Sequence, residues 1–119
     1  MAEHNNLGLK GERIAQEQLL KKGFVIKERN WRFKKAEVDI IAENEDFIIA
    51  VEVKTRSTAD FGNPQDFVSK KKIKLLVEAM NEYVISNNID KEVRFDIIAL
   101  TKEKDSFKIE HLEDAFLHF

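Results

Sequence analysis

The strongest constraint on the fold is a pair of short apolar runs separated by a polar turn. Residues 38–42 and 47–51 carry the apolar side chains, and Asn44-Glu45-Asp46 lies between them. Runs of this length that are rich in Ile and Val and bounded by turn residues are typical of buried β-strands. Because the connection is so short, the sequence predicts that the two strands pair as an antiparallel hairpin.

Three charged residues lie at the open end of this hairpin. Asp39 interrupts the first run, and Glu52 and Lys54 follow the second. Side chains alternate along a strand, so Glu52 and Lys54 share a face, and the pairing brings Asp39 near Glu52. Charged groups at such a place are costly unless they are compensated. Carboxylates suit a hard cation such as Mg²⁺, so the sequence predicts a metal site with a lysine beside it.

Length and composition are those of one ordinary globular domain. The chain has 119 residues, of which 43% are hydrophobic and 35% charged, and it has no cysteine. Disulfides and thiolate metal sites are therefore excluded. No apolar run approaches the ~20 residues that span a bilayer, and the first six residues lack the features of a signal peptide. We expect a cytoplasmic protein with no membrane segment.

Periodicity and turn residues predict two helices and five strands. The first helix is expected over residues 7–22, where apolar positions follow helical spacing and Gly23 can end the helix. The remaining elements are a strand from 24 to about 30, the two hairpin strands, a loop over 56–65 containing Gly62 and Pro64, a helix over 66–86, and strands over 93–100 and 107–109. The order α-β-β-β-α-β-β predicts an α/β sandwich with a mixed central sheet flanked by helices.

Several short motifs occur in this order along nearly the whole chain. They are Gly11-Glu12, Asn30-x-Arg32, Glu37-Val38-Asp39, Glu52-x-Lys54-x-Arg56, Phe61-Gly62-x-Pro64 and Arg94-Phe95-Asp96. Together they resemble the restriction-endonuclease-like, or PD-(D/E)XK, nuclease superfamily. Within it the chain is similar to small bacterial YraN-type proteins and, in pattern, to archaeal Holliday-junction resolvases. Ala36 stands where this family often has glycine, and Val38 replaces the proline of the superfamily's name; neither change removes a metal ligand.

The resemblance implies roles for four residues. Asp39 and Glu52 match the metal-binding carboxylates of the catalytic centre, and Lys54 matches the catalytic lysine. Glu12 matches a helix-borne glutamate that assists the metal. The implied activity is a Mg²⁺- or Mn²⁺-dependent DNA endonuclease, acting on branched or otherwise structured DNA. By analogy with resolvases, which need two active sites, the implied assembly is a homodimer.

Basic residues are expected to form a rim that contacts phosphates, although the formal net charge is −2. The residues assigned to it are Arg32, Arg56, Lys70, Lys71 and Lys72. Lysines at the start of a helix oppose the helix dipole, which favours an anion-facing role for them. The alternative is that these cations are only solvated surface. Arg94 and Asp96 are predicted to pair for structure and not for catalysis.

Each functional assignment has a simpler alternative. Glu52 and Lys54 alone would suit a solvated ion pair, and Glu12 in an early helical turn would suit the helix dipole. Glu37 shares the face of Asp39, either as a third ligand or as a partner of a basic neighbour. The main rival function is a nucleic-acid-binding or protein-interaction module that keeps the fold but cleaves nothing. A site for small phosphorylated ligands lacks a glycine-rich loop.

Overall fold

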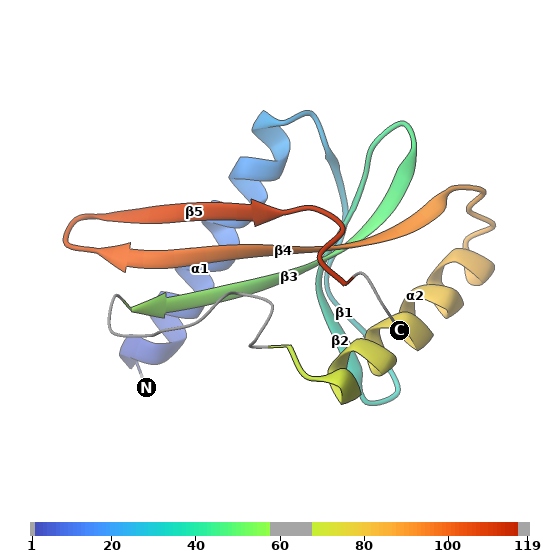
Figure 1. Ribbon diagram of the computed structural model, residues 1–119, viewed down its shortest axis with the longest axis horizontal. Coiled ribbons are helices and arrows are strands. Elements are labelled where there is room, and N and C mark those ends of the chain that lie inside the picture. Colours follow the sequence, from blue (N-terminus) through green and yellow to red (C-terminus); the bar gives the residue numbers. More distant parts are fainter. Residues whose placement is uncertain (1, 58–67, 117–119) are drawn as a thin grey trace.

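A five-stranded mixed sheet forms the middle of the molecule, with one helix against each face (Figure 1). The computed structural model describes residues 2–57 and 68–116, with side chains from residue 7 onward. Its elements are α1 (Ala2–Lys21), β1 (Val25–Phe33), β2 (Ala36–Glu43), β3 (Phe47–Ser57), α2 (Lys70–Ser86), β4 (Glu92–Glu103) and β5 (Ser106–Leu112). The predicted order and the α/β fold class are confirmed.

The strands lie in the order β1-β2-β3-β4-β5, and a single pair of neighbours is parallel. Strands β1, β2 and β3 form an antiparallel meander, and β4 and β5 form an antiparallel hairpin. Strands β3 and β4 are parallel, and α2 crosses between them (Figure 1). The predicted hairpin is β2–β3, and its turn is fixed by Asn44, whose side-chain oxygen accepts hydrogen bonds from the backbone N–H groups of Asp46 and Phe47.

The element boundaries differ from the sequence predictions at several ends. Helix α1 begins at Ala2 instead of residue 7, and α2 begins at Lys70 instead of residue 66. Ser69 starts α2 because its side chain accepts a hydrogen bond from the Lys72 N–H at 3.1 Å. Strand β3 runs to Ser57, into the predicted loop, because its parallel pairing with β4 continues to that residue. Gly62 and Pro64 lie outside the described residues.

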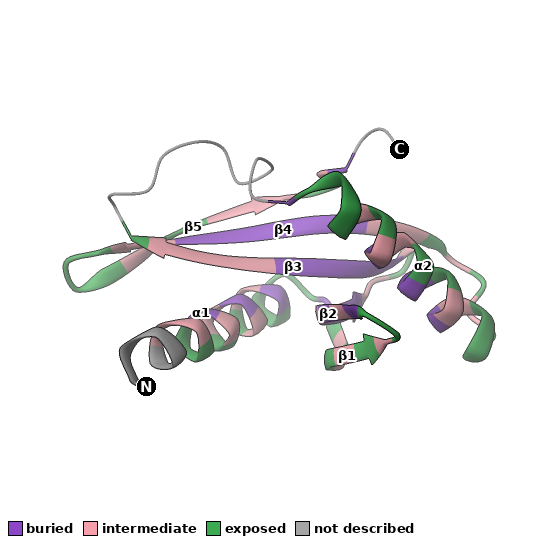
Figure 2. Ribbon diagram, turned by 90° about the horizontal axis from the view of Figure 1, so that it is seen from below, coloured by how far each residue is buried: buried purple, intermediate pink, exposed green. Residues whose placement is uncertain are grey.

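The hydrophobic core consists of two clusters, one on each face of the sheet. The cluster under α1 contains Leu19 and Ile49, and the cluster under α2 contains Met80 and Ile48. Because both faces are covered, the middle of β3 is continuously buried, which explains its unbroken apolar run (Figure 2). Neither helix of the described part is long and apolar enough to cross a membrane.

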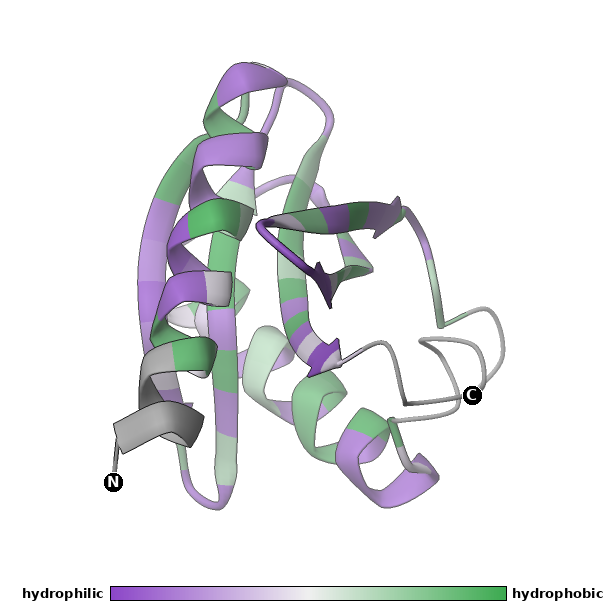
Figure 3. Ribbon diagram, turned by 90° about the vertical axis from the view of Figure 1, so that its left-hand side faces the viewer, coloured by the Kyte–Doolittle hydropathy of each residue, from purple (hydrophilic) through white to green (hydrophobic). Residues whose placement is uncertain are grey.

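Helix α1 packs closely on the sheet at a glycine. Hydrophobic and hydrophilic residues alternate along this helix (Figure 3). Ala15 and Leu19 are buried against the strands, whereas Leu9 and Leu20 are exposed. Gly11 is buried, and a Cβ atom at this position would collide with the Thr55 hydroxyl and approach Leu100 Cδ1 to 3.2 Å. The missing side chain therefore sets the distance between α1 and the strands that carry Thr55 and Leu100.

Strand β2 leaves β3 at Asp39. The β2–β3 ladder begins at the pair Glu43–Ile48 and ends at the pair Ile40–Val51, whereas β2 stays paired with β1 as far as Ala36. Val38 packs in the α2 cluster although Ile40, two residues away, packs in the α1 cluster. The regular alternation is thus interrupted at Asp39, which lies at the fork between the two strands.

Candidate functional site

The fork between β2 and β3 places Asp39 beside Glu52. The register of the ladder puts these residues next in line after the last pair. Asp39 Oδ2 accepts a hydrogen bond of 2.8 Å from the Val53 N–H. Beyond the end of the β2–β3 ladder, this side chain therefore bonds a backbone N–H of β3 that the β2 backbone no longer reaches. The predicted proximity of the two carboxyl groups is confirmed, because each contributes to the pKa of the other.

Glu52 is held in an environment that disfavours its negative charge. Its side chain is only 9% exposed, and its Oε1 atom is buried without a hydrogen-bond partner among the described residues. Burial and, after it, the negative charge of Asp39 raise the pKa of Glu52 to about 7. Burial also raises the pKa of Asp39, against the effect of its hydrogen bond to Val53. Such a pair of carboxyl groups is poised to accept either a proton or a cation.

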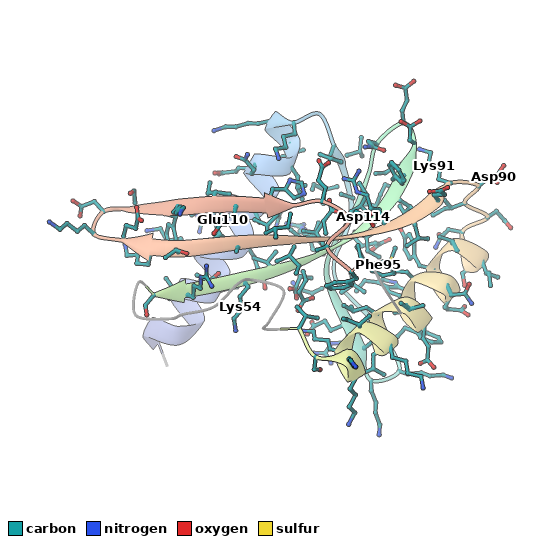
Figure 4. The ribbon with its side chains drawn as sticks, in the orientation of Figure 1. Lys54, Asp90, Lys91, Phe95, Glu110 and Asp114 are labelled. Carbon is teal, nitrogen blue, oxygen red and sulfur yellow. The ribbon has the colours of Figure 1, made fainter. Side chains whose placement is uncertain are left out.

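The cation that contacts Glu52 comes from helix α2. Lys72 Nζ forms an ion pair with Glu52 Oε2, whereas the sequence had assigned Lys72 only to phosphate binding. Burial lowers the pKa of Lys72, but the hydrogen bond to Glu52 and the charges of Glu52, Asp39 and Glu37 outweigh it and raise the pKa. Lys54 follows Glu52 on the same face of β3, on the part of the strand that extends past α2 (Figure 4).

Two further carboxylates lie near the pair. Glu12, half-buried on α1, has a pKa raised first by burial and then by the charge of Asp39, while a hydrogen bond with Asn30 opposes both. Glu37 pairs with Arg32, with 3.6 Å between Oε2 and Nη2. Within the part of the chain that the structure describes, no three His, Cys, Asp or Glu side chains are grouped closely enough to hold a metal ion.

Asp39 opens into a cavity of about 300 Å³ between the β1–β2 turn and the start of α2. Its lining residues are Lys35, Ala36, Glu37, Asp39, Ser69, Lys71, Lys72, Leu75 and Leu76. Figure 1 shows the turn between β1 and β2 close to the first turn of α2. The cavity therefore has carboxylates on one wall and lysines at its rim, a combination that suits a cation together with an anionic ligand.

The basic residues assigned from the sequence do not all line this cavity. Lys71 and Lys72 do, and Lys70 is exposed at the start of the same helix. Arg32 is 75% exposed and pairs with Glu37. Arg56 is only 11% exposed: its Nη2 lies 3.7 Å from a carboxylate oxygen of β5, and its Nε donates to a threonine hydroxyl of β4. Arg56 is thus held by side chains of β4 and β5 and is not part of the cavity lining.

A second charged cluster, which the sequence revealed only in part, is built on β4 and β5. Arg94 donates two hydrogen bonds of 2.9 Å to the fully buried Asp96, as the predicted structural pairing requires. His111 Nε2 also lies 2.9 Å from Asp96, and Lys22 Nζ lies 2.8 Å from His111 Nδ1. Burial alone would raise the pKa of Asp96, but the hydrogen bonds from His111 and Arg94 lower it.

The residues of the fork fit a hard divalent cation. Asp39 and Glu52 supply oxygen donors of the kind that Mg²⁺ prefers. Glu52 Oε1 is a buried acceptor without a partner in the described structure, and a bound cation would satisfy it. The pKa of each carboxyl group is raised, which a nearby positive charge would reverse. Water or a substrate oxygen would have to complete the coordination, since the described side chains provide no third ligand in place.

Comparison with known proteins identifies the family. The model of "Uncharacterised protein family UPF0102" matches residues 11–100. UPF0102 proteins of Flavobacterium psychrophilum and Christiangramia forsetii are 64% and 59% identical to this chain over its full length and theirs. One from Phocaeicola vulgatus is 47% identical, covering 98% of this chain and 96% of its own.

Among solved structures, Pyrococcus furiosus SfsA in complex with Ca²⁺ is similar at 15% identity with a TM-score of 0.33. The match covers 95% of this chain and 64% of that one. The UPF0102 relatives match far more closely and along the whole chain. This protein belongs to the UPF0102 family, the YraN-like group of the restriction-endonuclease-like superfamily.

Proposed function

We propose that this protein is a Mg²⁺- or Mn²⁺-dependent endonuclease that acts in the cytoplasm on DNA, including branched or otherwise structured DNA. The observation that carries the proposal is the buried Oε1 atom of Glu52, which has no partner in the described part and lies beside the carboxyl group of Asp39. Two adjacent buried carboxylates are costly, and Lys72 and the Val53 N–H compensate only one oxygen of each, so a bound cation would stabilise the pair further.

Each residue near the fork between β2 and β3 has its own role in the proposed phosphodiester cleavage. Asp39 and Glu52 would hold the ion. Glu12, on α1, would join them only after its side chain moves toward the pair, since no third ligand is in place among the described residues. When bound, a divalent ion supplies an oriented water and relief of charge on the phosphate. Lys54, on the face of β3 that carries Glu52, is assigned to stabilising negative charge on the phosphate that is attacked. Asp39 remains fixed throughout by the Val53 N–H.

The basic side chains at the cavity would position the DNA backbone. Lys35 and Lys71 line the cavity, while Lys70 and Arg32 are exposed near it. Contacts of this kind bind phosphates without reading the base sequence, which suits recognition of DNA shape. Cleavage of a four-way junction needs two cuts, so we further propose a homodimer with two copies of the site. Light scattering on the purified protein measures its oligomeric state directly.

Cleavage assays on matched variants test the proposal. The substrates are linear duplex, single strand, flap and four-way junction, each with Mg²⁺ or Mn²⁺ over a range of pH. Asp39→Asn and Lys54→Ala should abolish cleavage, and Lys54→Ala should still fold and bind metal. Asp46→Asn and Lys104→Ala make the same chemical changes at exposed turns and should keep full activity. Failure of the wild type to cut any substrate would refute the nuclease.

The absence of a third ligand in place among the described residues supports one other function. In that case the chain would be a non-catalytic module that binds nucleic acid through the same lysines. The two proposals make different predictions for Asp39→Asn, which removes a negative charge next to the cavity. A binding module should hold DNA at least as tightly after this change and show no dependence on divalent metal.

A further inference from the structure

We propose that Lys72 occupies the cation position of the metal-free site, and that a divalent ion must displace it in order to bind Asp39 and Glu52. This inference rests on the proposed metal dependence and names the group that competes with the metal. The starting observation is the ion pair between Lys72 Nζ and Glu52 Oε2. The sequence had assigned this lysine to phosphate binding and had expected Lys54 beside Glu52.

The position of Lys72 is explained by the carboxylates and not by its own helix. It lies in the first turn of α2, which has no acidic residue, and a lysine there opposes the helix dipole. Lys70 and Lys71 occupy the same turn but are not paired with Glu52. The charges of Glu52, Asp39 and Glu37 all act on Lys72. The ammonium group is therefore held where three negative charges converge.

The oxygen atoms that a metal needs are partly in use. Glu52 Oε2 is occupied by Lys72, and Asp39 Oδ2 is occupied by the Val53 N–H. Glu52 Oε1 has no partner in the described structure. A divalent ion bound to both carboxyl groups would lie next to the ammonium group, and two positive charges in contact repel strongly when they are partly buried. The metal and Lys72 are consequently alternative partners of the same carboxylates.

The cavity can accommodate the Lys72 side chain after a metal ion has displaced it from Glu52. This side chain is 46% exposed and lines the cavity that Lys35 and Lys71 also line. After release from Glu52, its ammonium group would remain at this rim without the carboxylate that now neutralises it. Metal binding would thus increase the positive charge that faces a phosphate, and by linkage a bound phosphate would favour the metal.

Calorimetric titration with Mn²⁺ alone tests the displacement without any cleavage assay. Lys72→Met removes the ammonium group and keeps most of the aliphatic stem. Its Mn²⁺ affinity should be about tenfold higher than that of the wild type, the order expected when a competing charged hydrogen bond is lost. Lys71→Met, on the same turn and at the same cavity, should change the affinity by less than about threefold, because the ion pair with Glu52 is made by Lys72 and not by Lys71.

The possible results separate this inference from the nuclease proposal. Equal or weaker Mn²⁺ binding by Lys72→Met would overturn the displacement and leave the metal-dependent nuclease standing. Binding by the variant but not by the wild type would support it most strongly. If neither protein binds Mn²⁺, the inference falls, and the cleavage assays decide separately on the nuclease. Should Lys72→Met fail to fold, Lys72→Gln, which is uncharged but can still donate a hydrogen bond, replaces it in the same comparison.

Discussion

Replacing Asp39 by asparagine should stabilise the metal-free protein. The side chain keeps its size, and its amide oxygen can still accept the hydrogen bond from the Val53 N–H. The negative charge that acts on Glu52 disappears, and the new NH₂ group can donate toward a carboxylate. A change that abolishes the proposed activity would therefore increase the free energy of unfolding, as is common where function requires unfavourable contacts.

The size of the effect follows from the pKa of Glu52. Raising this pKa from 4.5 to about 7 corresponds to ~3 kcal/mol of destabilisation when Glu52 is ionised in the folded protein. Burial is the largest cause and persists in the variant, while the charge of Asp39 is the second cause and is removed. We therefore expect Asp39→Asn to gain about 1 kcal/mol at pH 8, or a rise in Tm of roughly 3–6 °C.

The stability advantage of Asp39→Asn should increase as the pH rises. The pKa of Glu52 is higher in the folded protein than in the unfolded chain, so the folded state binds more protons between about pH 4.5 and pH 7. The contribution of Glu52 to stability is then fully present below pH 4.5 and is lost as the pH rises through 7. Asp39 has a raised pKa and acts in the same direction. The advantage of the variant should be small at pH 4.5 and largest above pH 7.

Urea denaturation in EDTA, repeated at several pH values, measures this difference. Asp46→Asn is the matched control, because it makes the same substitution at an exposed position in the β2–β3 turn. The control should follow the wild type at every pH. An Asp39→Asn protein that is no more stable than the wild type at pH 8, or whose advantage does not change with pH, would show that the two carboxyl groups do not repel each other in the folded state.

Three further outcomes are expected. Asp96→Asn should lower the free energy of unfolding by about 3–5 kcal/mol, because a buried guanidinium loses its carboxylate. Folding lowers the pKa of Asp96, so urea denaturation should show the full difference between variant and wild type above pH ~4. The difference should disappear as the pH falls further. Gly11→Ala should cost about 1–3 kcal/mol through its clash with Thr55, and a double-mutant cycle with Thr55→Ala should recover part of that cost. Fluorescence anisotropy should show DNA binding that weakens steeply with salt, and Lys35→Ala or Lys71→Ala should each reduce the logarithmic salt slope by about one.

The hairpin and its carboxylates were predictable because they depend on local patterns. A short polar turn fixes the register of two adjacent strands, and that register alone brings Asp39 to Glu52. The Arg94–Asp96 pair followed from the alternation of side chains within one strand. The α/β order was predictable for the same reason, since each element has its own periodicity and its own bounding residues.

The remaining parts of the site depend on contacts between distant segments. Lys72 reaches Glu52 only because α2 crosses from β3 to β4 and begins beside the fork, which no local pattern specifies. His111 joins Asp96 through the register of β4 and β5, and its isolated position in the sequence gave no signal. The end of β3 was misplaced because its partner, β4, and not its own composition decides where the strand stops.

The fork at Asp39 also divides the site into a rigid and an adjustable half. Glu52 lies on a strand that is bonded to β4 along its whole length, and Asp39 is tied to that strand through Val53. Lys72 lies in the first turn of a helix, where backbone hydrogen bonds are fewer and amide hydrogens exchange sooner. Ile73 and Leu76 of the same helix pack in or against the core, so only the exposed side chains of this turn can change without disturbing it. The carboxylates are thus held by paired strands, whereas the lysine that contacts Glu52 is held only at the end of a helix.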